Sequence, residues 1–187
     1  MTPPEEFIDR HPHELSGGQR QRVVIAAALS IEPGLLIADE PVSMLDVSVR
    51  AGILNLLKRL ADEEDIGVLM ITHDLATVAA YSDRIAVMYL GKIVESGPTL
   101  EVIADPQHPY TRALLSVVPS HDPTTTTNPT LLVGETPDAS NIPTGCRFHP
   151  RCPAVFEPCS HVEPELLDTS ANRKCACLLY AEVGSLA

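Results

Sequence analysis

Two adjacent carboxylates follow directly on a short apolar run, and they are the first candidates for chemistry. The run 35–38 is continuous and ends in Asp39, Glu40 and Pro41. Such a run is typical of a buried strand in a parallel sheet, and α/β folds bind ligands at the carboxyl ends of these strands. Charge at the mouth of a buried strand requires a partner, for which a hydrated Mg²⁺ is suited. The alternative is a strand that simply ends in two solvated acidic residues. It is disfavoured because the acids follow four apolar residues and precede Pro41, a turn residue.

A histidine occupies the corresponding place after a second apolar run. Residues 67–72 predict another buried strand, and His73 and Asp74 follow it. A lone histidine is usually structural. This one lies at the carboxyl end of a strand, as Glu40 does, which favours a functional role.

Ser16, Gly17, Gly18 and Gln19 precede a helix-favouring run. Serine is a strong N-cap type, and glycine allows a backbone to approach another group closely. A glycine-bearing loop at a helix start directs N–H groups and a positive dipole end outward, which attracts phosphate. The alternative is an ordinary capped helix.

The elements expected to position these residues alternate between strand and helix. Helices are predicted at about 16–31, 47–64, 75–81, 100–104 and 110–118, with a hairpin at 84–90 and 92–95 closed by Gly97 and Pro98. The helical spacing of one set of apolar residues predicts a core face: Val49, Ile53, Leu56, Leu57 and Leu60. Residues 119–143 are rich in proline and threonine and are interpreted as a linker, with a short strand at 131–133 as an option.

The composition narrows the possible functions. A chain of 187 residues supports one good-sized domain, or a domain and an appendage. Its net charge of −12 argues against nucleic acid as a partner. Its apolar runs are too short to span a bilayer, and residues 1–6 are acidic without an apolar signal region. We therefore expect a cytoplasmic protein.

All five cysteines lie after residue 145. In a reducing compartment such clustering favours a metal over disulfides. Four thiolates from one loop-rich segment suit a tetrahedral metal or an iron–sulfur cluster. The spacings match neither the usual zinc pairs nor ferredoxin runs, so zinc and unligated buried thiols both stay open.

Four motifs in order resemble those of ABC-transporter ATPases. Residues 15–19 resemble the ABC signature, 35–40 Walker B, 43–46 the D-loop and His73 the switch histidine, with Met44 where the family usually has a small residue. The resemblance implies part of the P-loop NTPase fold, α/β with a parallel sheet and flanking helices. It implies ATP and Mg²⁺ as cofactors and a second ATPase subunit as partner.

The resemblance also assigns roles. Asp39 is similar to the Mg²⁺ ligand, Glu40 to the general base and His73 to the γ-phosphate sensor. The signature residues Ser16, Gly17, Gly18 and Gln19 resemble the loop that closes over ATP held by the opposite subunit. Asp46 belongs to the loop that couples the two sites. These roles agree with phosphoryl transfer by positioning and charge stabilisation.

Residues 109–115 and 145–153 resemble the C-terminal extension of oligopeptide and dipeptide importers. The resemblance implies an ATPase part at 1–98 and a loop-rich, cysteine-containing extension at 99–187. It implies transmembrane permease partners, a peripheral place on the cytoplasmic face of the membrane and a [4Fe–4S] cluster. Its ligands would be Cys146, Cys152, Cys159 and Cys177, and Cys175 is the alternative to Cys177.

The sequence contains no Gly-x-x-x-x-Gly-Lys-Ser/Thr, the Walker A loop that cradles phosphates. We therefore expect the C-terminal part of an ATPase subunit, from a truncated gene, a split gene or a fragment, that binds ATP poorly alone. The alternative is a non-catalytic metal-binding or interaction module that has lost nucleotide binding.

Overall fold

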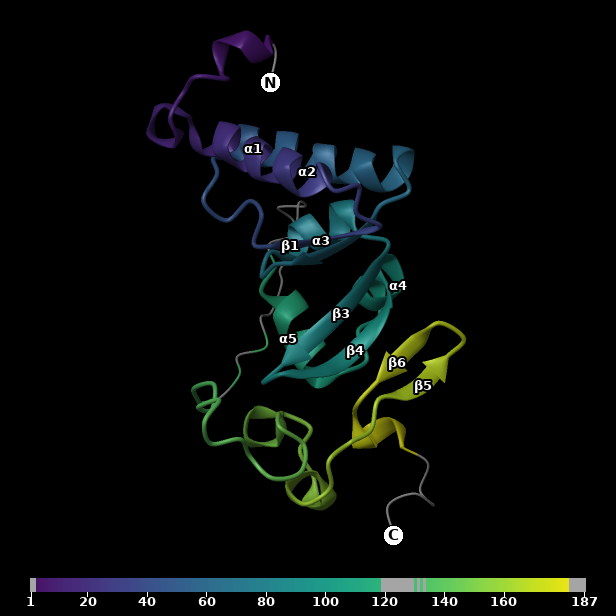
Figure 1. Ribbon diagram of the computed structural model, residues 1–187. Helices are drawn as coiled ribbons and strands as arrows, with labels where there is room; N and C mark the ends of the chain where they lie inside the picture. Colours follow the sequence, from purple (N-terminus) through teal and green to yellow (C-terminus); the bar gives the residue numbers. More distant parts are fainter. Residues whose placement is uncertain (1–2, 119–129, 131, 133, 182–187) are drawn as a thin grey trace, which may run out of the picture. The chain divides into compact units, whose positions relative to one another are not determined.

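The computed structural model describes residues 3–118, 130, 132 and 134–181 (Figure 1). The chain forms two compact units, Met1–Asp74 and Leu75–Ala187, and each is described by itself. The boundary expected at residue 98 stays a prediction.

The first unit is a parallel strand pair with two helices. Its elements are η1 (Pro4–Glu6), η2 (Pro12–Glu14), α1 (Gly17–Leu29), β1 (Leu35–Asp39), α2 (Val47–Glu63) and β2 (Gly67–Ile71). β1 and β2 pair in parallel from Leu35↔Gly67 to Asp39↔Ile71. The helix α1 packs against α2, and α2 also contacts β2. The predicted α/β class and both predicted strands are confirmed.

The predicted core face of α2 is largely confirmed. Ile53 and Leu57 are buried, and so is Leu54, which the helical spacing missed. The other predicted members, Val49, Leu56 and Leu60, are half-buried.

The prediction that both strands are buried is wrong. Leu35, Ile37, Leu69 and Ile71 expose about half or more of their surface. Their alternate positions and the strand register put them on one face of the pair. Their exposed fractions show that this face of the strand pair is open in the described part of the chain. The apolar composition predicted the two strands correctly. It could not predict whether other residues of this chain pack on both of their faces.

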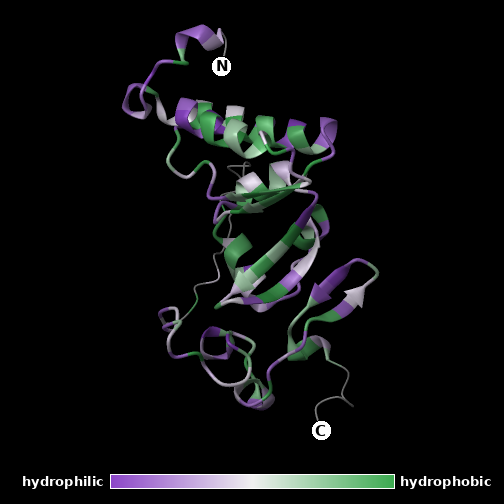
Figure 2. Ribbon diagram, in the orientation of Figure 1, coloured by the Kyte–Doolittle hydropathy of each residue, from purple (hydrophilic) through white to green (hydrophobic). Residues whose placement is uncertain are grey.

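The second unit is built on an antiparallel sheet in the order β3-β4-β6-β5. Its elements are α3 (Leu75–Tyr81), β3 (Arg84–Tyr89), β4 (Lys92–Pro98), α4 (Thr99–Ala104), α5 (Pro109–Ser116), η3 (His149–Arg151), η4 (Glu157–Ser160), β5 (Leu167–Ser170), β6 (Arg173–Cys175) and η5 (Leu178–Tyr180). The predicted hairpin and helices are confirmed. The strands β5 and β6 were not predicted, because both are short and polar (Figure 2).

The core of the second unit is a cluster of aromatic rings on an aliphatic base. Tyr89, Val87, Val94 and Phe148 are buried together. The Tyr89 and Phe148 rings meet nearly edge to face, with centroids 5.2 Å apart, and Tyr110 lies 4.8 Å from Tyr89. Such pairs add to the stabilisation that burial gives.

Residues 119–129, 131 and 133 lie outside the described residues, and so do most of the expected linker and the optional strand at 131–133. The described stretch 134–143 contains no helix or strand. Among the described residues, no helix is long and apolar enough to cross a membrane.

Candidate active site

Glu40 and His73 meet at the edge of the parallel strand pair. The Nδ1 atom of His73 lies 2.7 Å from Oε1 of Glu40. Glu40 follows the last residue of β1, and its N–H donates to the carbonyl of Ile71 at the end of β2, at 2.9 Å. Parallel pairing brings both carboxyl ends to one edge, so two side chains 33 positions apart come into contact. The sequence predicted each residue at the carboxyl end of a strand, and the structure has each of them following one.

The backbone of Glu40 is held in an unusual conformation. Its φ is 45°, in the left-handed region, which costs a non-glycine residue about 1 kcal/mol or more. Ser43 stabilises the turn, because its N–H and its hydroxyl both donate to the carbonyl of Glu40, at 3.3 and 3.1 Å. Such conformations cluster at functional sites. Here the conformation sets the direction in which the Glu40 carboxylate leaves β1.

Asp39 ends β1 with an exposed carboxylate. Among the described residues, its carboxylate has no ion-pair or hydrogen-bond partner. A single free carboxylate at a strand end fits Mg²⁺, which keeps most of its waters and takes one or two carboxylates plus phosphate oxygens. The described residues hold no group of three or more His, Cys, Asp or Glu side chains arranged to bind a metal by themselves.

Ser16 caps α1, as predicted. Its hydroxyl oxygen accepts from the Gln19 N–H at 3.3 Å, and its own N–H donates to the Gln19 side-chain oxygen at 2.8 Å. This is a capping box. The N–H groups of Gly17 and Gly18 lie in the first turn, where helix geometry leaves them without intrahelical acceptors. The start of α1 therefore keeps the donors that could meet a phosphate.

The glycines also have a packing role that the sequence did not reveal. A Cβ on Gly18 would lie 2.2 Å from Cγ1 of Val49 on α2, and one on Gly17 would lie 3.2 Å from Leu45. The close approach that glycine permits is therefore made within the protein. The two glycines thereby pack against Leu45, which precedes Asp46, and against Val49, which lies three residues after it.

Asp46 caps α2. Its Oδ1 accepts from the Val49 N–H at 3.0 Å and from the Ser48 hydroxyl at 2.7 Å. These bonds hold the pKa of Asp46 below its usual range. Beside it, Met44 and Val47 are 97% and 81% exposed. An anion fixed at the helix start thus lies between two apolar side chains that face solvent.

Arg50 is a site residue that sequence reasoning missed. Its guanidinium Nη1 lies 3.7 Å from Oδ2 of Asp74, and Nη2 donates to the Leu45 carbonyl at 3.5 Å. The Asp74 N–H donates to the Thr72 hydroxyl at 3.1 Å. Arg50 therefore connects the Asp46 segment to the residue after His73. Two features of the sequence could have indicated this contact: an arginine one turn into a predicted helix, and an aspartate next to His73.

The structure joins the candidate residues in two groups. Glu40 contacts His73, and Gly17 and Gly18 pack beside the Asp46 segment. No hydrogen bond or ion pair among the described residues links Ser16, Gly17, Gly18 or Gln19 to Glu40 or His73. In the described part of the first unit, the signature loop and the acid–histidine pair are therefore not joined by a polar contact.

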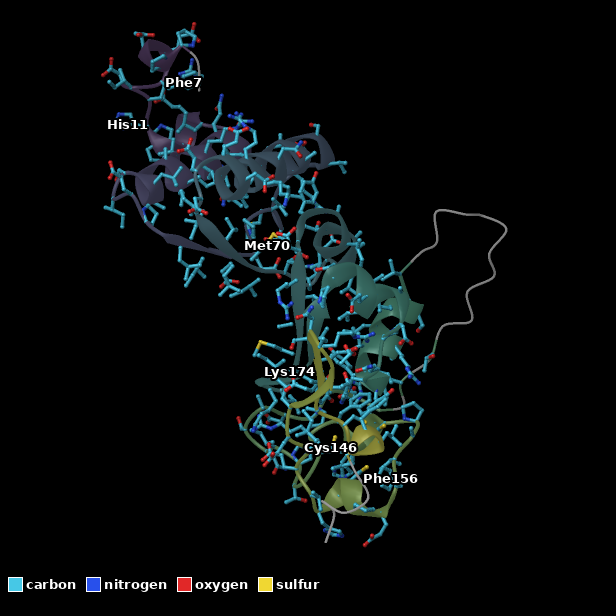
Figure 3. The ribbon with its side chains drawn as sticks, turned by 90° about the vertical axis from the view of Figure 1, so that its right-hand side faces the viewer. Phe7, His11, Met70, Cys146, Phe156 and Lys174 are labelled. Carbon is cyan, nitrogen blue, oxygen red and sulfur yellow. The ribbon has the colours of Figure 1, made fainter. Side chains whose placement is uncertain are left out.

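The cysteines form a group of free thiols in the second unit; Figure 3 labels Cys146. Burial raises the pKa of Cys177 to about 11, and Cys146, Cys152 and Cys159 add to the rise by charge repulsion. Burial also raises the pKa of Cys175, which pairs with Glu95 across β4 and β6.

The expected iron–sulfur or zinc site is not supported. The thiols that were expected to act as ligands are neighbours, but the described residues do not arrange three of them to hold a metal. The present arrangement does not fit the cluster, and no function is derived from it.

Comparison with known proteins assigns both parts of the sequence. Residues 2–43 match the ABC transporter family model, and residues 94–159 match that of the oligopeptide/dipeptide transporter C-terminal region. The dipeptide transport ATP-binding protein of Haemophilus influenzae is 46% identical over 92% of this chain and 53% of its own length. A Brucella ovis protein named for peptide import ATP binding is 46% identical over 94% of this chain and 55% of its own.

Solved structures give a more partial likeness. A component of an ABC transporter complex from Clostridium perfringens is 40% identical and covers 50% of this chain and 37% of its own, with a TM-score of 0.47. The chain spans about half the length of the curated relatives it matches. Over that span it belongs to the ABC-transporter ATP-binding family, in the group that carries the oligopeptide/dipeptide transporter C-terminal region.

Proposed function

We propose that this chain supplies the hydrolytic and sensing residues of an ATP-driven importer for dipeptides or oligopeptides. The observation that carries the proposal is the 2.7 Å contact between Glu40 and His73 at the carboxyl ends of β1 and β2. The names of the relatives, which refer to peptide import and dipeptide transport, support the cargo.

Glu40 is the general base in this proposal. A carboxylate can only accept, so Nδ1 of His73 donates to Oε1. The second oxygen of Glu40 is then available to take a proton from the attacking water. The contact fixes the carboxylate while leaving that oxygen open, and the left-handed turn at Glu40 holds its direction.

His73 acts through its second ring nitrogen. With Nδ1 turned to Glu40, Nε2 is directed away from the carboxylate, and 80% of the side chain is exposed. A ring that donates on both sides carries a positive charge, which suits a γ-phosphate. Asp39 would hold Mg²⁺, which neutralises charge on the phosphates.

The signature loop acts on a second subunit. Ser16, Gly17 and Gly18 offer a hydroxyl and N–H groups at the positive end of α1, on a surface not bonded to Glu40 or His73. We propose that these groups close over ATP held by a partner ATPase subunit, with Gln19 completing the loop and Asp46 linking the two sites. Permease subunits and a peripheral place on the cytoplasmic face of the membrane belong to the same proposal.

Uptake of a peptide by cells that produce this protein tests the proposal. Glu40→Gln keeps size and hydrogen bonding but cannot take the proton, so uptake of a radiolabelled dipeptide should fall about 100-fold or more. Glu63→Gln is the matched control, because its pair with Arg59 is exposed and such pairs contribute little. Normal uptake by the Glu40→Gln cells would refute the role of Glu40.

Calorimetry with ATP examines the chain alone. Its sequence has no lysine-bearing phosphate loop, so we expect no tight binding at micromolar protein. In a mixture with an ATPase subunit that carries that loop, Ser16→Arg should lower the rate of phosphate release. Tight binding by the chain alone, or no effect of Ser16→Arg, would contradict the proposed division of roles.

A further inference from the structure

A cavity in the second unit is lined by none of the residues assigned to ATP. Its volume is about 420 Å³, within the range of small-molecule sites. The wall is formed by the first half of β4, the segment 146–148 and the segment 163–166. Ile93, Phe148 and Leu166 give it an apolar interior.

His108 contributes a polar group to this wall. Its side chain is 1% exposed, and its Nδ1 accepts from the Tyr110 N–H at 3.1 Å. In the neutral ring the proton therefore sits on Nε2. Burial lowers the pKa of His108 to about 4, which keeps the ring neutral.

The Nε2–H of His108 has no acceptor among the described residues. This atom is not among the fully enclosed side-chain atoms that lack a partner, so it keeps contact with open space instead of being sealed in the core. The residue lines the cavity, so an acceptor oxygen on a bound molecule would satisfy it.

Charges of both signs surround the entrance. Lys92 lies 2.9 Å from the carboxylate of Glu163, and Arg147 lies 3.8 Å from it. Glu165 adds a second carboxylate without an ion-pair partner among the described residues. A ligand of one sign would meet like charge here, whereas a zwitterion can pair with both.

We propose that this cavity binds a small zwitterion with an apolar side chain, the chemistry of a free amino acid or short peptide. Its carboxylate meets Lys92, Arg147 and the Nε2–H of His108, its ammonium meets Glu165, and its apolar side chain enters between Phe148 and Leu166. The inference goes beyond the proposed function and does not depend on nucleotide chemistry.

Calorimetry with the full chain tests the site, with the dipeptide alanyl-leucine as probe. We expect saturable binding, and binding at least about tenfold weaker for N-acetyl-leucine and for leucine amide, which each carry one charge. Equal binding of either analogue would overturn the assignment to a zwitterion. No saturable binding at millimolar peptide would overturn the site and leave the ATPase proposal untouched.

Two variants locate the binding. Leu166→Trp fills the cavity and should abolish binding. His108→Asn keeps a side-chain oxygen for the Tyr110 N–H, since asparagine is a good N-cap, but lacks the second ring nitrogen, and should weaken binding about fivefold or more. If His108→Asn fails to fold, Lys92→Met at a half-exposed position replaces it, with the same expected loss.

The matched control is Lys174→Met. Lys174, labelled in Figure 3, is an exposed lysine on β6 that pairs with Asp168 and does not line the cavity. It should leave binding unchanged. Binding that Leu166→Trp does not alter, in a variant that melts cooperatively by circular dichroism, would overturn the proposal.

Discussion

Replacing Gly18 by alanine tests whether the signature segment is packed as described. The added Cβ would lie 2.2 Å from Cγ1 of Val49, far inside van der Waals contact. Valine in a helix has one strongly preferred rotamer, so the γ-carbon cannot swing away. Overpacking of this kind costs about 1–3 kcal/mol. The better helix preference of alanine offsets up to about 1 kcal/mol of that.

A double-mutant cycle separates the clash from other effects. Val49→Ala removes both γ-carbons, after which the nearest atom of residue 49 is its Cβ, at an ordinary 3.5 Å. Val49→Ala alone should cost about 1 kcal/mol, because a half-buried side chain is shortened. In the double variant the clash is absent, so the two changes should couple favourably by about 1–3 kcal/mol.

Urea unfolding followed by circular dichroism at 222 nm measures the cycle. Gly52→Ala is the matched control, since its Cβ would meet only the flexible end of Arg22 at 3.3 Å, and it should stabilise the chain by up to about 1 kcal/mol. A coupling near zero between positions 18 and 49 would refute the packing of α1 on α2. It would return the glycine to a role in ligand contact alone.

Three further predictions concern the second unit. Between pH 6.5 and about 4 the unfolded chain protonates His108 and the folded chain does not; stability should therefore fall by up to about 3 kcal/mol as pH drops through this window, and thermal melts of His108→Asn should lose that slope. With a pKa of about 11 rather than 9.0, Cys177 should be alkylated by iodoacetamide at pH 8 about 100-fold more slowly in the folded than in the unfolded chain, by mass spectrometry; equal rates would contradict its burial. Arg173→Met leaves the fully buried Glu95 without its cation and should cost about 3–5 kcal/mol in urea unfolding; adding Glu95→Gln should recover only part of it, because both carboxylate oxygens accept backbone N–H groups, of Gln107 and His108, and an amide has only one such oxygen.

The positions of the candidate site residues on their strands and helices could be predicted from the sequence better than their surroundings. Glu40 and His73 could each be placed at the carboxyl end of a strand, because each follows an apolar run, but their 2.7 Å contact was not predicted. The cap at Ser16 followed from residue type alone. The exposure of Ile37 and Leu69 could not be predicted, since periodicity identifies a strand but not what covers it.

Contacts that depend on tertiary packing were also beyond the sequence. Gly18 was interpreted through ligand approach, yet its space is taken by Val49 on another helix. The polar strand β6 was missed because its pairing with β4 brings together residues almost 80 positions apart. The buried ion pair between Glu95 and Arg173 depends on the same pairing of β4 with β6, and no local sequence pattern predicts it.

The most direct measurement is a double-mutant cycle of Glu40 and His73 on phosphate release by the assembly proposed above, in which this chain acts with an ATPase subunit that carries the phosphate loop. The two side chains are in contact, with Nδ1 of His73 2.7 Å from Oε1 of Glu40. We therefore predict that Glu40→Gln together with His73→Gln lowers the rate little more than Glu40→Gln alone. Independent, multiplying losses, or a rate that neither variant changes, would contradict a shared role in hydrolysis.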